Sequence, residues 1–192
     1  MSQIFDKEGN VIPVTLVKAA PNVVLQIRTK EKDGYEAVQV GAGERKIKNI
    51  KKAQQGHFKD LGNLRFVREF RTSEKLERGQ KVDVSVFAEG DTVKVSGISK
   101  AKGFQGVVKR HGFHGAPATH GTKHAHRQPG SIGATWPQRV IKGMRMAGRM
   151  GGERVSVKNL KIAKVDLENN LLAIKGAVPG RRGTLLEIKG LA

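Results

Sequence analysis

The chain has 192 residues, with 36 Lys and Arg against 17 Asp and Glu, and its formal net charge of +19 predicts a polyanionic partner such as nucleic acid or an acidic membrane surface. This length allows one hydrophobic core and an appendage, and with 5% aromatic residues the core is expected to be aliphatic. The lack of cysteine excludes disulfides and Cys-based zinc sites, and no apolar run of about 18 residues is present to span a membrane.

Runs of β-branched residues with alternating polarity and turn residues at their ends predict many short strands. In chain order we expect them at Val11–Val17, Val23–Arg28, Glu36–Val40, Leu64–Phe70, Lys81–Phe87, Thr92–Ile98, Arg154–Val165, Leu171–Lys175 and Leu185–Lys189. In the Lys81–Phe87 run, valines alternate with other residues, which predicts one buried face. Short strands joined by turns favour a small antiparallel barrel over a parallel sheet.

The predicted barrel body comprises residues 1–98 and 153–192. The Lys-rich stretch Glu44–Leu61 interrupts the strand pattern, so we expect a short helix and a small insertion around 44–63. Residues Asp166–Asn170 are predicted to form a hairpin turn, because Asn tolerates the left-handed backbone conformation.

Residues 99–152 are predicted to form a long irregular extension of this body. The interval between Asp91 and Glu153 contains no acid, although it holds 11 Lys and Arg and five of the six histidines. Proteins in water normally mix acids with bases to limit self-repulsion, so phosphates are the expected counter-charge. A flexible basic tail is the alternative, but the internal position and mixed composition favour a loop ordered by its partner. Its basic stretches are too Gly-rich for a membrane-surface helix, so no membrane partner is expected.

The residues of this extension suggest stacking and phosphate binding more than catalysis. Trp136 is the only tryptophan and lies far from any predicted strand, so we expect it to stack on a base or fill an RNA pocket. A carboxylate that could support nucleophilic catalysis is absent near Ser131 and Thr119. The histidines match no zinc spacing and have no Cys, Asp or Glu among them; they are His111, His114, His120, His124 and His126. We therefore expect no metal, no cofactor, no small-molecule substrate and no enzymatic activity.

Several ordered motifs resemble a known family. They are SKAKGFQGVVKR at Ser99–Arg110, ATHG at Ala118–Gly121, HRQPGSIG at His126–Gly133, KG at Lys142–Gly143 with MAGRMG at Met146–Gly151, and NLLAIKGAVPG at Asn170–Gly180. Together they resemble the universal large-subunit ribosomal protein family L-three in its bacterial or organellar form. Weaker similarity to that family covers nearly all of the chain.

The resemblance implies a six-stranded antiparallel barrel of the translation-protein type. It further implies that the extension reaches through large-subunit rRNA toward the peptidyl transferase centre, and that the protein acts early in subunit assembly. Neighbouring large-subunit ribosomal proteins are the other implied partners, on a cytoplasmic ribosome or an organellar one. A DNA-binding protein is the competing class, but no helix or ribbon suited to the major groove is predicted.

Two features depart from the family pattern. The Gly- and Lys-rich first strand that usually precedes Ile4-Phe5 is expected to be missing. The stretch Ala134–Gln138 is one residue shorter than the bacterial tip, where many members carry a glutamine that is methylated in some of them. It is more similar to the Trp-containing tip of archaeal and eukaryotic relatives, so no glutamine methylation is expected here. The predicted tip is Thr135, Trp136 and Pro137.

Charge and resemblance together give the candidate rRNA-binding residues. They are Lys100, Lys102, Lys109, Arg110, His120, Lys123, His124, His126, Arg127, Ser131, Trp136, Arg139, Lys142, Arg145 and Arg149.

Overall fold

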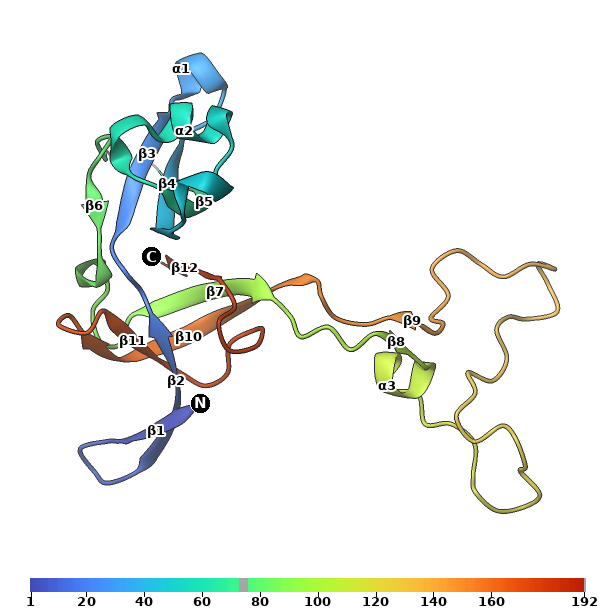
Figure 1. Cartoon of the computed structure of the whole chain (residues 1–192). Helices are drawn as coiled ribbons and strands as arrows, with labels where there is room; N and C mark the ends of the chain where they lie inside the picture. Colours follow the sequence, from blue (N-terminus) through green and yellow to red (C-terminus); the bar gives the residue numbers. More distant parts are fainter. Residues whose placement is uncertain (73–75, 192) are drawn as a thin grey trace. The chain divides into compact units, whose positions relative to one another are not determined.

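A computed structural model describes residues 1–72 and 76–191, and within them the chain is mainly β (Figure 1). The larger sheet has the strand order β1-β2-β11-β10-β7-β12. Its strands are β1 (Ser2–Phe5), β2 (Val11–Lys18), β7 (Thr92–Ile98), β10 (Arg154–Asp166), β11 (Leu171–Lys175) and β12 (Leu186–Gly190). The pairs β1·β2, β2·β11 and β10·β11 are antiparallel. The predicted mainly β, antiparallel class is therefore confirmed.

The six strands do not close into the predicted barrel. The strand order ends at β1 on one side and at β12 on the other, and these two strands are not hydrogen-bonded to each other in the described chain. Strand β1 was not predicted, because four residues are too few to show a convincing alternation. It pairs with β2 from Ser2↔Val14 to Phe5↔Val11 and so forms one edge of an open sheet.

A second antiparallel sheet has the order β5-β4-β3-β6. Its strands are β3 (Asn22–Arg28), β4 (Ala37–Glu44), β5 (Leu64–Phe70) and β6 (Lys81–Val82). The short helix α1 (Lys30–Asp33) joins β3 to β4, and the Arg28 guanidinium donates to Asp33, which lowers the pKa of that carboxyl.

The helix expected in Glu44–Leu61 is confirmed. This insertion contains the 3₁₀ turns η1 (Ile47–Asn49) and η2 (Lys59–Leu61) and the helix α2 (Lys52–Phe58). Phe58 and Ile50 are buried with Leu25 of β3, so the insertion covers one face of the smaller sheet with an apolar cluster. Its lysines remain exposed on the other side.

The predicted strand Lys81–Phe87 is wrong beyond Val82. Residues Val84–Val86 form the 3₁₀ turn η3, and the Asp83 side chain accepts a hydrogen bond from the Ser85 amide at 3.0 Å. This side-chain cap satisfies the backbone amide with a hydrogen bond that competes with those between the strands of a sheet. Consequently Val84 is buried while Val86 is 61% exposed, which breaks the expected alternation.

The predicted hairpin turn between β10 and β11 is confirmed. Asn170 adopts a positive φ of 53°, and the Asp166 carboxylate accepts hydrogen bonds from the side chain and the backbone amide of Asn169. These bonds lower the pKa of the Asp166 carboxyl, and the bond from the Asn169 side chain lowers it most.

Buried aliphatic residues form the core of the larger sheet, including Val14, Val93, Ile162, Leu172 and Ile174.

The chain forms two compact units. One comprises Met1–Lys94, Lys158–Ala177 and Lys189–Ala192, and the other comprises Val95–Val157 and Val178–Ile188. The second unit therefore contains all of the predicted extension. Among the described residues, no helix has the length and apolarity that a membrane crossing requires.

Candidate nucleic-acid interface

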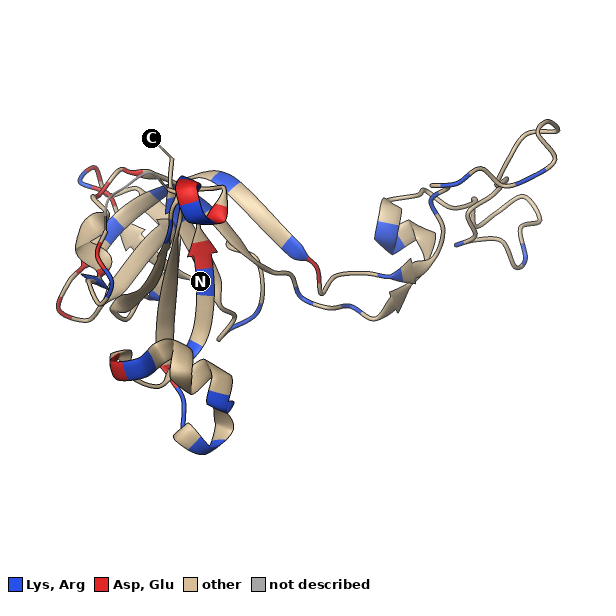
Figure 2. Ribbon diagram, turned by 90° about the horizontal axis from the view of Figure 1, so that it is seen from above, with Lys and Arg blue, Asp and Glu red and all other residues tan. Residues whose placement is uncertain are grey.

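Residues 99–152 carry cations without any acid to neutralise them (Figure 2). Ten Lys and Arg lie there, and nine of them are exposed, with Arg110 half-buried. This one segment therefore holds +10 of the formal net charge of +19. Uncompensated exposed cations repel one another and attract a polyanion, which is the electrostatic pattern of a nucleic-acid interface.

A short two-stranded stem holds the two ends of this segment together. Strand β8 (Phe104–Gln105) pairs with β9 (Gly148–Arg149). Beyond the paired residues, the Lys102 amide donates to the Met150 carbonyl and the Met150 amide donates to Gly103, both at 2.9 Å. The helix α3 (Val107–His111) follows β8, and its Val107 side chain is 2% exposed. The stem and α3 are regular, whereas residues 112–147 contain neither helix nor strand, as the predicted irregular extension requires.

Gly151 closes this stem in a way that no other residue type permits. Its φ is +75°, and a Cβ placed on it would lie 2.1 Å from the Lys100 carbonyl oxygen. Both the left-handed backbone and the close approach therefore require glycine at this position.

We predict that Gly151→Ala opens the stem. Left-handed strain alone costs about 1–2 kcal/mol, and the clash with Lys100 adds to it, so hydrogen-exchange protection of the Lys102 and Met150 amides should fall by more than about tenfold. Gly121→Ala is the matched control, because Gly121 has a φ of +80° but no atom within 4 Å of the added Cβ. Equal protection of the stem amides in both variants would contradict this role of Gly151.

Two predicted RNA ligands near the stem, Arg110 and Arg145, also have internal partners. The Arg110 guanidinium donates to the Met146 carbonyl at 2.7 Å, and the His111 ring contacts the same oxygen at 3.0 Å. These bonds fasten α3 to the returning chain, so Arg110 has a structural task whatever else it binds. The Arg145 guanidinium lies over the Phe113 ring, 5.1 Å from its centroid.

Beyond the stem, the loop is held by a few backbone contacts. The Ala116 amide donates to the His126 carbonyl at 3.1 Å, and a Cβ on Gly115 would lie 2.2 Å from the same oxygen. The Ser131 hydroxyl donates to the Gly133 carbonyl at 2.7 Å, so this predicted ligand also shapes its own turn. Trp136 is 79% exposed, so its ring is accessible to a partner.

The histidines of the loop remain apart from any set of metal ligands. Across residues 1–72 and 76–191, no three His, Cys, Asp or Glu side chains come together in a group that could hold a metal ion. The predicted loop histidines, His120, His124 and His126, are all exposed. Their exposure leaves the imidazoles available for hydrogen bonds and stacking.

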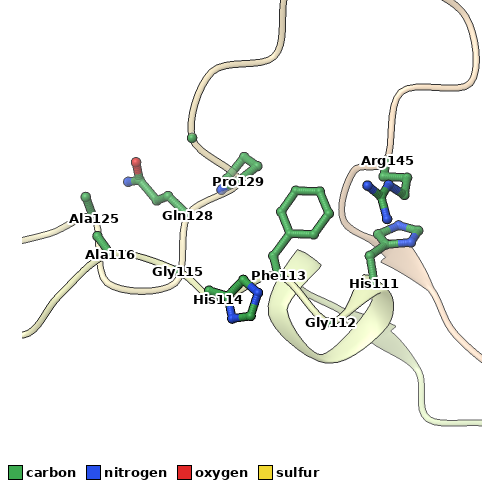
Figure 3. Close-up of a pocket in the computed structure, with 11 residues that line it drawn as sticks. His111, Gly112, Phe113, His114, Gly115, Ala116, Ala125, Gln128, Pro129 and Arg145 are labelled. Carbon is green, nitrogen blue, oxygen red and sulfur yellow. The ribbon is translucent and has the colours of Figure 1, made fainter.

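Sequence reasoning missed two features of possible function. A pocket forms around Phe113 (Figure 3). The sequence did not predict this pocket, because the residues that line it come from three separate stretches of the chain. The insertion also displays an exposed group of cations with no acid between Arg45 and Lys59; the stretch was identified as Lys-rich, but no function was assigned to it. The group is Arg45, Lys46, Lys48, Lys51, Lys52 and Lys59.

Comparison with known proteins gives full-length relatives. The family model described as Ribosomal protein L3 matches residues 59–170. A protein of Bacillus cytotoxicus named Large ribosomal subunit protein uL3 is 50% identical over 99% of this chain and 92% of its own. Proteins of the same name from Geobacillus sp. strain WCH70 and Listeria welshimeri are 52% and 50% identical, over 98% of this chain and 91% and 92% of theirs.

Proposed function

Since the chain belongs to the ribosomal protein L3 family, we propose that residues 99–152 bind large-subunit rRNA and that this binding anchors the protein in the ribosome. The protein is a structural, non-enzymatic component of the large ribosomal subunit. The observation that carries the proposal is the run of exposed cations in an interval without acids. Phosphates are the natural counter-charge for such a surface.

The geometry supports shape-directed binding more than reading of base pairs. Residues 112–147 have no regular structure, and Gly and Pro are spread through them, so the backbone can follow the surface of folded RNA. Arg side chains can pair with phosphate through two hydrogen bonds or stack on bases. The proposal extends to early subunit assembly, to neighbouring ribosomal proteins as partners and to a tip at Thr135–Pro137 near the peptidyl transferase centre.

A DNA-binding role is less well supported. Recognition of duplex DNA usually places a helix or a two-stranded ribbon in the major groove. The longest helix in the described part of the chain is α2, with 7 residues, and it packs Phe58 into the core. The paired part of β8 and β9 is two residues on each side.

Salt dependence tests the proposal. If about eight cations of the extension neutralise phosphates, the log–log slope of affinity against salt is roughly −6 to −7. Filter binding of the full chain to bacterial large-subunit rRNA should therefore weaken by about 10⁴-fold between 50 and 200 mM salt. Duplex DNA of equal nucleotide content is the competitor and should displace little rRNA. If the affinity for rRNA did not change with salt concentration and the protein failed to co-sediment with large subunits, rRNA binding would be refuted.

A further inference from the structure

We propose that the pocket around Phe113 receives a single unstacked base of the rRNA, an inference that rests on the proposed rRNA-binding function. The cavity is about 530 Å³, within the size range of ligand pockets. It lies entirely within the second compact unit, and we call it the Phe113 pocket. Its lining residues are His111, Gly112, Phe113, His114, Gly115, Ala116, Ala125, Gln128, Pro129, Gly130 and Arg145.

The aromatic ring of Phe113 lines the pocket, and the guanidinium of Arg145 lies over it. The Arg145 guanidinium lies over the ring at 5.1 Å from its centroid, and the His111 ring stands beside it, tilted by 46° with centroids 6.0 Å apart. In Figure 3 the Phe113 ring lies between Arg145 and Pro129. A base that enters the pocket could stack on the part of the Phe113 ring that Arg145 leaves uncovered, as bases stack on aromatic side chains in RNA-binding proteins.

A close approach of two chain segments forms one wall of the pocket. The chain passes so closely at Gly115 that a Cβ there would meet the His126 carbonyl oxygen at 2.2 Å. The Ala116 amide donates to that same carbonyl at 3.1 Å and ties the two arms together. On the opposite side, the His111 ring and Arg110 both contact the Met146 carbonyl. Contacts that are already made in the free protein reduce the entropy lost when a ligand binds.

The polar groups of the pocket suit a nucleotide. None of the lining residues is acidic, so an anionic ligand meets no repulsion. The Gln128 carboxamide donates one hydrogen bond to the His124 carbonyl at 3.3 Å and keeps a second N–H and its oxygen for a base edge. His114 also lines the pocket and is exposed. Arg145 retains N–H groups at its edges while its face covers Phe113, so it can pair with the phosphate of the same nucleotide. An aliphatic peptide side chain would leave these donors unused.

Substitution of Phe113 separates stacking from charge. Base–aromatic stacking is worth ~1–3 kcal/mol, so Phe113→Leu should weaken the binding of the full chain to large-subunit rRNA by at least about fivefold at fixed salt. The salt slope should stay unchanged because no cation is lost, and Phe113→Tyr should retain the affinity. Phe5→Leu is the matched control, since Phe5 lies outside the extension on β1 and is 67% exposed.

The outcomes distinguish the pocket from the proposed function. Should the unaltered chain fail to bind rRNA in a salt-dependent way, the proposed function fails. Should the unaltered chain bind while Phe113→Leu binds equally well, the base-pocket proposal is overturned and the proposed function stands. An equal loss in Phe113→Leu and Phe5→Leu would likewise overturn the pocket, because it would report a general effect of losing an aromatic ring.

Photochemical cross-linking tests the pocket in the unaltered protein, so its result does not depend on whether a substitution disturbs the loop. Large subunits that contain the full chain are irradiated at short ultraviolet wavelength, and the cross-linked peptides are sequenced. A nucleotide attached at Phe113 or His114 supports the pocket. Attachment elsewhere in residues 99–152, with none at 111–116, refutes it and leaves rRNA binding intact.

Discussion

Replacing Lys123, Arg127, Arg139 and Lys142 together with glutamine should lower the affinity of the full chain for large-subunit rRNA by about a thousandfold at 0.1 M salt. Each phosphate contact releases roughly 0.7–0.9 of a counterion, so each cation contributes about five- to eightfold at this salt concentration. The four side chains are exposed in the irregular part of the extension, where their removal leaves no buried group unpaired. The salt slope should become shallower by about 3 to 4, because four contacts are lost.

A second quadruple variant controls for net charge. Lys7, Lys30, Lys32 and Lys164 are exposed and lie beside acids in the chain, so their replacement with glutamine changes the net charge equally, from +19 to +15. Their phosphate affinity is already opposed by neighbouring carboxylates, and we expect less than a tenfold loss of affinity. If both variants lose affinity equally, the total charge of the protein matters and the location of its cations does not.

Large subunits that contain Trp136→Ala should assemble normally but form peptide bonds about ten- to a hundredfold more slowly. Trp136 is 79% exposed, so its removal costs the free protein little packing, and the melting temperature should stay unchanged. If the tip supports the RNA of the peptidyl transferase centre, loss of the ring displaces that RNA slightly. A misplacement of about 1 Å near reacting groups can slow a reaction by about 10²-fold.

The measurements for this variant are subunit sedimentation and the rate of a single peptidyl transfer under saturating substrate. Trp136→Phe preserves a flat ring and should retain most of the rate, which distinguishes stacking from a general disturbance of the loop. Normal peptidyl transfer by assembled Trp136→Ala subunits would contradict the placement of the tip at the catalytic centre. Failure of those subunits to assemble would instead assign Trp136 to assembly.

Local patterns were sufficient for most of the strands. The strand propensity of the runs that form β2, β3 and β5 and the turn at Asp166–Asn170 depend on neighbouring residues, and the structure agrees with the predictions there. The strand prediction for Lys81–Phe87 was wrong beyond Val82, because the Asp83 carboxylate accepts a hydrogen bond from the Ser85 amide and the chain turns there. Side-chain caps of this kind compete with strand propensity and leave the hydrophobic pattern unchanged.

The Phe113 pocket could not be found from the sequence. The Phe113 ring, the Arg145 guanidinium and the His126 carbonyl that Gly115 approaches come from three stretches that no periodicity connects. Only the pairing of β8 with β9 and the bonds to the Met146 carbonyl bring them together. The charge of the extension was visible in advance, but the sequence contained no signal that a hollow would form within it.

The sequence by itself predicted a polyanionic partner and determined the β-rich character of the body, because charge runs and strand periodicity are properties of residues near one another in the chain. Only the tertiary structure decided that the six-stranded sheet stays open between β1 and β12, that a stem closes the base of the extension and that Phe113 faces a cavity. These features depend on contacts between residues far apart in the chain. Their energies come from packing and hydrogen-bond geometry that exist only once the backbone has folded.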